Sequence, residues 1–329
     1  MCHVGALPTV SIIGAGNVGT ACAASIVARG IADVRLLDIL EDEAAAKAMD
    51  INHAAVAHRS CRRVSVCDSL HALNDSRIVV FSAGSPRRSG MNREDLLKEN
   101  WQVLCGYCEW IAAHCPHAVV LVITNPVNIL TTLIAERFGR INVLGMGCCL
   151  DTVRFRYYLG RAAGAAAQTV DGLVVGSHDR NMLPLTRLAT IGGARADERL
   201  TRAQLTEVVE KTRQAGNVIL AKMKTRGSWY AGGVIAADIV NAVLTDSRRV
   251  FPVSVRCPGQ PGLDGACLSL PARVGAHGAE TVLTLDLEPD ETRAIERAAR
   301  GIAQAVRSTG AGVSAAGPGA DDEEITPHA

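Results

Sequence analysis

Short apolar segments alternate with longer segments of helical periodicity through the first half of the chain. The short segments are hydrophobic at nearly every position, which is typical of parallel strands buried on both faces. The predicted strands are Thr9 to Ile13, Val34 to Leu37, Ile78 to Phe81, Val119 to Ile123 and Val143-Leu144. Helical patterns separate them, at 18–26, 39–58, 94–114 and 127–138. This alternation predicts an α/β fold, a doubly wound parallel sheet with helices on both faces.

The pattern changes after about residue 150. A helical stretch from Thr152 to Ala167 leads into an apolar strand at Val170 to Gly176, and residues 250–287 have the pattern of short antiparallel strands. The turns between them are expected at Pro258-Gly259, Leu263-Asp264-Gly265 and Ala276-His277-Gly278. A last helix is predicted from Asp290 to Arg307.

Two domains are therefore expected, an α/β domain at 1–150 and a mixed α+β domain at 151–307. Residues 308–329 are rich in Gly and Ala and contain an acidic run, so they are predicted to form a disordered tail.

The composition is that of an ordinary globular protein, with 48% hydrophobic and 20% charged residues. A formal net charge of +1 gives no global field, so neither nucleic acid nor a membrane is expected as a partner. The uncharged stretch from Ala118 to Ala135 contains several polar residues and is a poor membrane span. The N-terminus lacks a secretory pattern, so we expect a cytoplasmic protein. Eleven cysteines, an odd number, argue for reduced thiols.

Three glycines follow the first predicted strand, in the order Gly14-Ala15-Gly16-Asn17-Val18-Gly19. Such glycines let the backbone approach a pyrophosphate at the positive end of a helix, although the same spacing also occurs in ordinary tight turns. Asp38 ends the next strand, nineteen residues after Gly19, where a carboxylate can accept hydrogen bonds from a ribose diol. An acid at this place repels a 2′-phosphate. The context predicts a dinucleotide site that prefers NAD to NADP.

A loop rich in Gly, Ser and Pro after the third strand contains Arg87, Arg88 and Arg93. It is either a solvated basic segment or a mobile lid, hinged at Gly84 and Gly90, that brings guanidinium groups onto an anionic substrate. The residues of the loop alone do not choose between these two interpretations.

Two further sets of polar residues lie in the second half. Asp151 and Arg154 share one face of a predicted helix, a spacing that most often marks a surface ion pair. His178 lies in a short loop after an apolar strand, where a lone histidine is more often structural than catalytic. Their significance comes from being found together.

Taken in order, these segments resemble the lactate/malate dehydrogenase family, from Thr9 to about Arg307. The segments that carry the resemblance are the glycine turn with Asp38, the arginine loop, Thr124-Asn125-Pro126-Val127-Asn128, Leu150-Asp151-Thr152-Val153-Arg154, Gly176-Ser177-His178 with Met182-Leu183-Pro184, and Gly227-Ser228-Trp229-Tyr230-Ala231. The resemblance implies hydride transfer between C2 of a 2-hydroxy acid and C4 of nicotinamide, with an N-terminal Rossmann domain and a C-terminal catalytic domain. It also implies NAD as the cofactor, a small-molecule substrate, and a homodimer or homotetramer.

The resemblance assigns roles to four polar residues. His178 matches the catalytic histidine, which takes the hydroxyl proton in one direction and returns it in the other. Asp151 matches the carboxylate that fixes the tautomer of that histidine. Arg154 matches the arginine that holds the C1 carboxylate at two points, and Arg93 the loop arginine that polarises the keto oxygen.

Other positions match residues that line the substrate or the cofactor. Asn125 and Ser228 match substrate-side residues, although Gly232-Gly233 replaces the residues usual after Ser228. The implied cofactor-binding set is Gly14, Gly16, Asn17, Val18, Gly19, Asp38, Ala83, Gly84, Asn100, Thr124 and Asn125.

Arg87, six residues before Arg93, matches the position that faces the C3 substituent of the substrate. An arginine there resembles the malate-specific members, because oxaloacetate brings a second carboxylate, whereas a glutamine resembles the lactate-specific ones. A desolvated arginine without an anion is costly, so it also rejects pyruvate. The neighbouring Arg88 leaves open which arginine reaches the substrate. We expect malate and oxaloacetate as substrates; the alternatives are lactate or another 2-hydroxy acid, and a catalytically silent nucleotide-binding homologue.

Two features depart from the family or offer other chemistry. Asp179 and Arg180 follow His178, and these charges can shift its pKa in either direction. Cys105-Gly106-Tyr107-Cys108 has the spacing of a redox dithiol or half a zinc site, but it lies inside a predicted helix, where buried cysteines behave as small apolar residues. The adjacent Cys148-Cys149 is expected to pack in the core, since a disulfide between neighbours is strained. No metal is expected.

Overall fold

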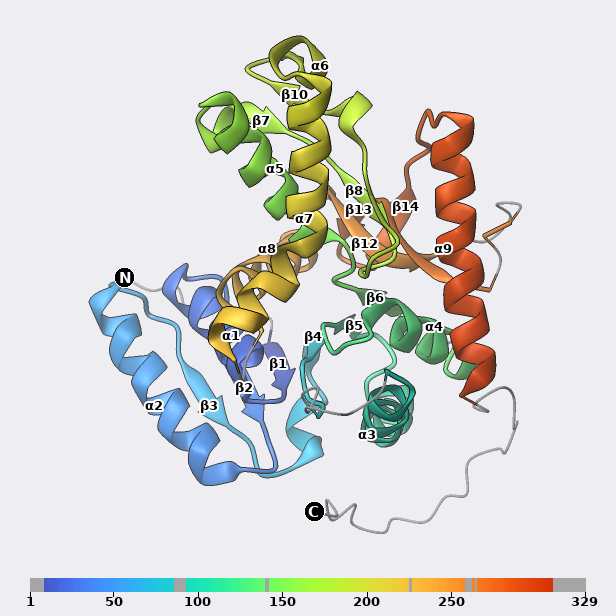
Figure 1. Ribbon diagram of the computed structural model, residues 1–329. Helices are drawn as coiled ribbons and strands as arrows, with labels where there is room; N and C mark the ends of the chain where they lie inside the picture. Colours follow the sequence, from blue (N-terminus) through green and yellow to red (C-terminus); the bar gives the residue numbers. More distant parts are fainter. Residues whose placement is uncertain are drawn as a thin grey trace.

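A single large sheet runs through both halves of the computed structural model, which describes residues 9–85, 93–139, 142–224, 227–257, 262–263 and 265–309 (Figure 1). Its strands follow the order β3-β2-β1-β4-β5-β6-β12-β13-β8-β9, and β14 pairs with β13. Helices cover both faces of this sheet, so the expected α/β class is confirmed.

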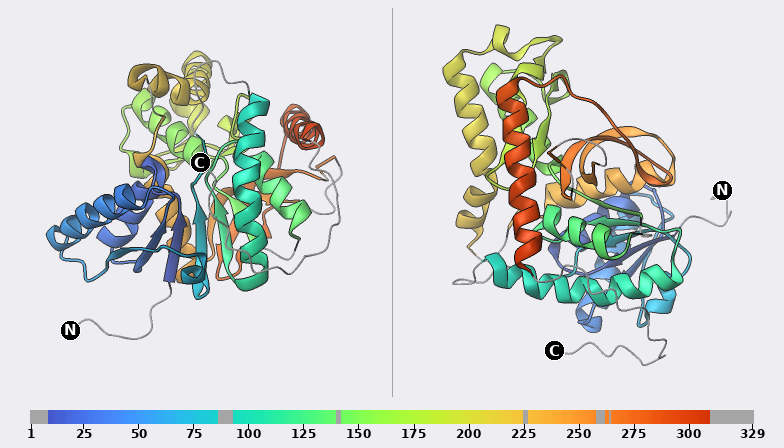
Figure 2. Two further views of the ribbon diagram at one scale, coloured as in Figure 1. Left: turned by 90° about the horizontal axis from the view of Figure 1, so that it is seen from below. Right: turned by 90° about the vertical axis from the view of Figure 1, so that its right-hand side faces the viewer.

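The first half of the chain forms the parallel part of the sheet. Its strands are β1 (Thr9–Ile13), β2 (Val34–Leu37), β3 (Val64–Val66), β4 (Ser76–Phe81), β5 (Val119–Val122) and β6 (Asn142–Gly145). Helices α1 (Asn17–Ala28) and α2 (Glu41–Ala57) lie on one face, and α3 (Arg93–His114) and α4 (Val127–Arg137) on the other (Figure 2). This is the doubly wound arrangement that the apolar strands predict, and only β3 was not predicted.

The carboxyl ends of these strands are level with one another. Ile13 at the end of β1 pairs with Leu37 and with Phe81, and Phe81 pairs with Val122. Because ligands of such sheets bind at the carboxyl edge, the loops that follow these strands define one candidate site.

In its described residues, the second half adds antiparallel strands and four long helices. The helices are α5 (Cys149–Ala163), α7 (Arg202–Met223), α8 (Tyr230–Leu244) and α9 (Pro289–Ser308), with a short α6 (Ala196–Arg199). The strands are β7 (Val170–Asp171), β8 (Val174–Gly176), β9 (Met182–Pro184), β10 (Thr190–Ile191), β11 (Ala194–Arg195), β12 (Arg249–Arg256), β13 (Cys267–Gly275) and β14 (Gly278–Val282). Short 3₁₀ turns lie at Leu70–Leu73, Ala167–Thr169 and Thr186–Leu188.

Several expected boundaries of the second half need correction. The expected strand at 170–176 is divided, because β7 pairs with β10 in a separate three-stranded sheet while β8 joins the large sheet. The expected helix at 152–167 begins three residues earlier and ends at Ala163, because Gly164 adopts a left-handed conformation with φ +63°. The turn at Ala276-His277-Gly278 is confirmed between β13 and β14. Pro258, Gly259 and Asp264 lie outside the described residues, as does most of the predicted tail.

Helix α8 joins the two halves by packing against α1. A Cβ at Gly233 would lie 2.5 Å from Cβ of Ala21 and 2.7 Å from the backbone N of Cys22, so only glycine fits there. This contact gives Gly233 a structural reason. Within the described residues, no helix combines the length and apolar composition needed to cross a membrane.

The described residues form two hydrophobic cores. The larger one covers both faces of the main sheet. The smaller one lies between α5, α7 and the short strands β7 to β11, around the fully buried Phe155 and Leu159. The residues of α5 that face away from this core are the ones that reach the candidate site.

Candidate active site

The turn between β1 and α1 contains three glycines. Packing requires glycine at Gly14 and Gly19, but not at Gly16. Gly14 has φ +102°, and a Cβ there would lie 2.4 Å from the backbone N of Ala83. A Cβ at Gly19 would lie 2.0 Å from the carbonyl oxygen of Gly14. Gly16 is exposed, and a Cβ there would meet nothing within 4 Å. The open space at Gly16, beside a helix N-terminus without a side-chain cap, fits a bound anionic group such as a pyrophosphate.

Asp38 lies against the glycine turn, as its position at the end of β2 predicts. Its Oδ2 accepts a hydrogen bond from the backbone N of Ala15 at 2.5 Å, and its Oδ1 accepts one from the backbone N of Leu40 at 2.9 Å. Lys47, for which the sequence gives no signal, donates from Nζ to the carbonyl oxygen of Ala15 at 2.7 Å. The two hydrogen bonds of Asp38 hold its carboxylate beside the glycine turn.

The loops after β4 and β5 are tied together by one buried amide. Oδ1 of Asn100 accepts a hydrogen bond from the backbone N of Ser85 at 2.7 Å, and its Nδ2 donates to the carbonyl oxygen of Asn125 at 2.8 Å. Thr124 donates from Oγ1 to the carbonyl oxygen of Ala83 at 2.6 Å. Asn100 is buried and therefore positions the two loops, while Asn125 is exposed.

Helix α5 presents Asp151 and Arg154 on one face, as their spacing predicts. Asp151 is the third residue of the helix, where the positive end of the helix dipole favours a carboxylate, and its side chain is 0% exposed. Nη1 of Arg154, whose side chain is 14% exposed, donates to Oδ1 of Asp151 at 3.2 Å. The pair is a buried ion pair and not the surface pair that is commoner at this spacing. Gly216 of α7 lies near the guanidinium: a Cβ there would be 3.6 Å from Nη1, an ordinary van der Waals distance.

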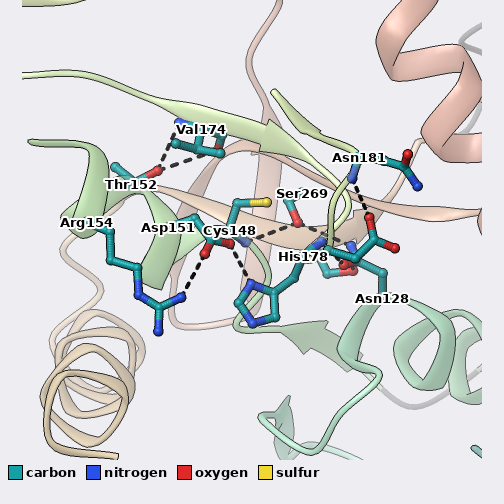
Figure 3. Close-up of polar contacts among 11 residues, drawn as sticks. Asn128, Cys148, Asp151, Thr152, Arg154, Val174, His178, Asn181 and Ser269 are labelled. Carbon is teal, nitrogen blue, oxygen red and sulfur yellow. Dashed lines mark hydrogen bonds and ion pairs between the residues drawn. The ribbon is translucent and has the colours of Figure 1, made fainter. Parts of the chain in front are cut away.

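His178 meets the same carboxylate from the loop between β8 and β9. Its Nδ1 lies 2.5 Å from Oδ2 of Asp151, and Figure 3 shows Asp151 between His178 and Arg154. Since a carboxylate only accepts hydrogen bonds, Nδ1 is the donor, which leaves Nε2 for other chemistry. The His178 side chain is 17% exposed, so the ring is reachable from outside.

The two groups shift each other's pKa in opposite directions. Burial opposes ionisation of Asp151, but His178 and Arg154 outweigh it and hold the pKa of Asp151 below its usual value. Burial likewise opposes protonation of His178, but Asp151 outweighs it and raises the pKa of His178. Arg154 works against this rise and Asp179 adds to it. The acid that follows His178 therefore favours its protonated form, which answers the question that the sequence leaves open.

A buried polar network that the sequence alone does not reveal supports His178. The backbone N of His178 donates to Oδ1 of Asn128 at 2.8 Å. Nδ2 of Asn128 lies 3.0 Å from Oγ of Ser254 and 3.2 Å from Oγ of Ser269. The available signal was a serine inside each of two otherwise apolar strands, in Val253-Ser254-Val255 and Leu268-Ser269-Leu270.

Asn128 also links the two groups of residues described above. It lies three residues after Asn125 on the segment that follows β5, and it contacts the backbone of His178 directly. The histidine loop is thereby placed beside the carboxyl edge at which the glycine turn and Asp38 lie. The arrangement can hold an anionic cofactor, a carboxylate and a transferable proton side by side.

Some of the expected site residues are not placed by these contacts. Val18 packs towards α8, since a Cβ at Gly232 would lie 3.6 Å from Cγ1 of Val18. Ser228 is half-buried just before α8, and no polar contact among the described residues joins it to His178. Arg87, Arg88 and Gly90 lie outside the described residues. So does the side chain of Arg93, although its backbone begins α3.

The cysteines within the described residues show no sign of thiolate chemistry. Cys105 and Cys108 both lie within α3, and burial raises the pKa of Cys108 to about 12. A reactive dithiol needs the opposite shift. Nine cysteines of the described chain are free, whereas Cys61 is disulfide-bonded, so the expectation of reduced thiols is wrong for that residue. In the described ranges, His, Cys, Asp and Glu form no group of three or more that could hold a metal ion.

Comparison with known families gives a match for each half of the chain. Lactate/malate dehydrogenase, NAD binding domain, matches residues 9–143, and lactate/malate dehydrogenase, alpha/beta C-terminal domain, matches residues 148–310. A malate dehydrogenase of Salinibacter ruber is 33% identical over 293 residues, 88% of this chain and 93% of the relative. A malate dehydrogenase of Bacteroides thetaiotaomicron is 35% identical over 310 residues, 92% of this chain and 99% of the relative.

Solved structures share the whole fold. Malate dehydrogenase from Cryptosporidium parvum has a TM-score of 0.88 at 32% identity and covers 92% of this chain and 99% of its own. Lactate dehydrogenase from Eimeria maxima with NADH and oxamate has a TM-score of 0.88 at 26% identity and covers 93% of this chain and 95% of its own. These matches confirm the resemblance seen in the sequence: the chain is an oxidoreductase of the lactate/malate dehydrogenase family, with that family's NAD-binding domain.

Proposed function

We propose that this chain is an NAD-dependent malate dehydrogenase, which moves a hydride and a proton between malate and oxaloacetate. The observation that carries the proposal is the buried Asp151 carboxylate, bonded to Nδ1 of His178 at 2.5 Å and to Nη1 of Arg154 at 3.2 Å. The Asp151 carboxylate thus lies between His178, which can move a proton, and Arg154, a fixed cation that can bind a carboxylate. Oxidation of a 2-hydroxy acid needs both.

His178 moves the proton. With Nδ1 donating to Asp151, the Nε2 atom takes the hydroxyl proton during malate oxidation, and Asp151 stabilises the imidazolium that forms. In oxaloacetate reduction the same atom returns the proton. The raised pKa of His178 favours the protonated form that reduction needs.

The arginines bind and polarise the substrate. Arg154, held by Asp151, presents a planar guanidinium that can bind the C1 carboxylate at two points. Arg93 polarises the keto oxygen as negative charge develops on it, the role that its match in the family implies.

The carboxyl edge of the sheet holds the cofactor. NAD supplies the hydride acceptor, and NADH the donor, when bound there. We assign the pyrophosphate to the open N-terminus of α1 at Gly16 and the ribose hydroxyls to Asp38. The nicotinamide side belongs to Gly84, Thr124 and Asn125, whose loops Asn100 ties together.

The choice of malate over lactate rests on the names of the relatives and on Arg87. Both relatives described above carry the name malate dehydrogenase at 33% and 35% identity. Arg87 offers a cation for the second carboxylate of oxaloacetate, which pyruvate lacks. Because solved lactate dehydrogenases have the same fold, substrate choice needs its own test.

The test of the proposal is NADH oxidation with oxaloacetate and with pyruvate, at equal enzyme and cofactor. We expect kcat/KM to favour oxaloacetate by about 1,000-fold, roughly 4 kcal/mol. The Arg87→Gln variant is expected to lower this ratio by at least tenfold, with Arg88→Gln as the matched control. A preference for pyruvate would keep the chemistry and overturn the substrate, while turnover of neither would favour a silent nucleotide-binding homologue.

We also propose that copies of this chain associate through the face formed by α1, α2 and α8. A groove of about 770 Å³ lies between these helices, and its rim exposes Tyr230 by 71% and Val234 by 49%. Val56 on α2 is 76% exposed. Light scattering of the eluted protein is expected to give the mass of a dimer or tetramer, and Tyr230→Glu to lower that mass. A monomer would contradict the proposal.

A further inference from the structure

The hydroxyl of Ser269 contacts the start of the helix that carries Asp151 and the Asn128 side chain that holds the His178 loop. Its Oγ accepts a hydrogen bond from the backbone N of Cys148 at 3.1 Å, at the start of the helix that bears Asp151. The same Oγ lies 3.2 Å from Nδ2 of Asn128, whose Oδ1 accepts the backbone N–H of His178. One oxygen atom therefore connects to Asp151 through α5 and to His178 through Asn128 (Figure 3).

The position of Ser269 in the sheet explains how one atom reaches both. Ser269 pairs with Gly176, two residues before His178, and with Ser254, which in turn pairs with Gly145 at the end of β6. The loop to His178 and the chain to α5 both leave the sheet beside this residue. Ser269 thus lies where the two catalytic elements diverge.

The residues around Ser269 leave space for a hydroxyl. Ser269 is 0% exposed, and a Cβ at Gly147 would lie 2.6 Å from its Oγ. Gly147 has φ +51°, so the backbone bends around the hydroxyl at a position that suits glycine. A buried hydroxyl is costly unless its hydrogen bonds are made, and this one accepts two.

The amide of Asn128 suits its neighbours on both sides. Its oxygen faces the N–H of His178, while its nitrogen faces the carbonyl oxygen of Cys267 at 3.1 Å as well as the two serine hydroxyls. An amide supplies an acceptor and a donor at once, so the bond to the histidine loop is fixed in orientation.

We propose that Ser269 is a positioning residue that sets the separation of His178 and Asp151. The proposal rests on the proposed function, in which this pair moves the proton. The 2.5 Å contact between Nδ1 and Oδ2 raises the pKa of His178, and Coulomb attraction falls as the groups separate. Loss of the Ser269 hydroxyl loosens both elements, so it lowers the pKa of His178 and slows proton transfer.

Ser254 offers a matched control within the same network. It too is 0% exposed and lies 3.0 Å from Nδ2 of Asn128, but its other bond goes to the carbonyl oxygen of Cys267 and not to the helix that bears Asp151. Ser269→Ala and Ser254→Ala both remove one buried hydroxyl beside Asn128. Only Ser269→Ala removes the bond to the start of α5.

The experiment is an NMR titration of the histidine side chains in the substrate-free protein, with the His178 signal assigned by its loss in His178→Asn. We expect Ser269→Ala to lower the pKa of His178 by roughly 0.5–1 pH unit, and Ser254→Ala by less than a third of that. In parallel, Ser269→Ala is expected to lower kcat for oxaloacetate about tenfold while the KM for NADH stays unchanged. Ser11→Ala, which removes a buried hydroxyl bonded to Ser76, controls for general destabilisation.

An unchanged pKa of His178 in Ser269→Ala, or an equal shift in Ser254→Ala, would overturn the proposal. If Ser269→Ala does not fold, Ser269→Cys keeps a polar γ atom that is a weaker acceptor, and the same comparison decides. If the wild-type protein does not turn over oxaloacetate, the proposed function fails, whereas the titration still decides whether Ser269 sets the pair.

Discussion

The two sides of the candidate site are shaped by opposite means. On the nucleotide side, the turn from β1 into α1 depends on missing side chains: Gly14 and Gly19 have backbone or side-chain atoms where a Cβ would be, and Gly16 has open space. On the catalytic side, the geometry depends on buried polar side chains that contact each other across long sequence separations. Asp151 and His178 are 27 residues apart, and His178 and Asn128 are 50 apart.

This difference predicts how each side fails. At Gly14 and Gly19 the turn has no room for an added atom, so substitution there changes the backbone itself. In the buried pair of Asp151 and His178, a substitution that changes the shape of a side chain is expected to destabilise the fold. A substitution that changes its charge is expected to destabilise the fold more, because an unpaired buried charge costs about 3–5 kcal/mol. The following changes separate the two kinds of failure.

The largest effect is expected for His178→Asn. The amide cannot move the proton, so kcat for oxaloacetate reduction is expected to fall by about 1,000-fold or more. The glycine turn and Asp38 are untouched, so the Kd for NADH, measured by fluorescence titration, is expected to stay within about twofold. Retained turnover would remove His178 from the mechanism.

A sharper contrast is expected between Gly14→Ala and Gly16→Ala. Gly14→Ala forces a Cβ to within 2.4 Å of the backbone N of Ala83, so we expect a loss of several kcal/mol of unfolding free energy. Gly16→Ala meets no neighbour, so its Tm is expected to stay within a few degrees while NADH affinity falls about tenfold or more. Equal affinity in Gly16→Ala and wild type would place the pyrophosphate elsewhere. Thermal melts and NADH titrations measure both effects.

The smallest effect is the pH dependence of the catalytic pair. The raised pKa of His178 stabilises the fold below the ordinary value of 6.5, and this contribution is lost as the pH rises through the raised pKa. The lowered pKa of Asp151 stabilises the fold above the ordinary value of 3.8, and this contribution is lost as the pH falls through the lowered pKa. The Tm difference between wild type and His178→Asn is therefore expected to be largest between these two values. A difference that grows above neutral pH would contradict the pairing.

The same shift has a kinetic signature. Reduction needs protonated His178, so kcat/KM for oxaloacetate is expected to fall as the pH rises through the pKa of His178. In Asp151→Asn the attraction that raises this pKa is gone, so the fall is expected at lower pH. If kcat/KM falls at the same pH in both proteins, the fall does not come from His178.

The local parts of this molecule could be predicted from the sequence. The strands β1, β2 and β4, the glycine turn and the carboxylate of Asp38 follow from residues that are close along the chain. The turn that divides β13 from β14 was equally visible. Each of these is decided by a few neighbouring side chains and backbone angles.

The parts of the molecule that depend on contacts between distant residues could not be predicted from the sequence. A serine in an apolar strand gives no indication that it faces Asn128, because that contact is set by the pairing of β12 and β13 and by the approach of α4. The split between β7 and β8 depends on which sheet each strand joins. The sign of the charge effect on His178 required knowing that Asp179 faces it and that Arg154 opposes it.

The contact between α8 and α1 bears on how this protein can be recombined with its relatives. Because Gly233 touches Ala21 and the backbone of Cys22, the first and second halves of the sequence share a surface with no room for an added methyl group. The sheet also continues from β6 into β12, so a cut near residue 150 would expose a strand edge as well as this helix face. A chimera that exchanges the nucleotide-binding half must therefore carry α8 with it, or match the small residues of α1 to those of α8.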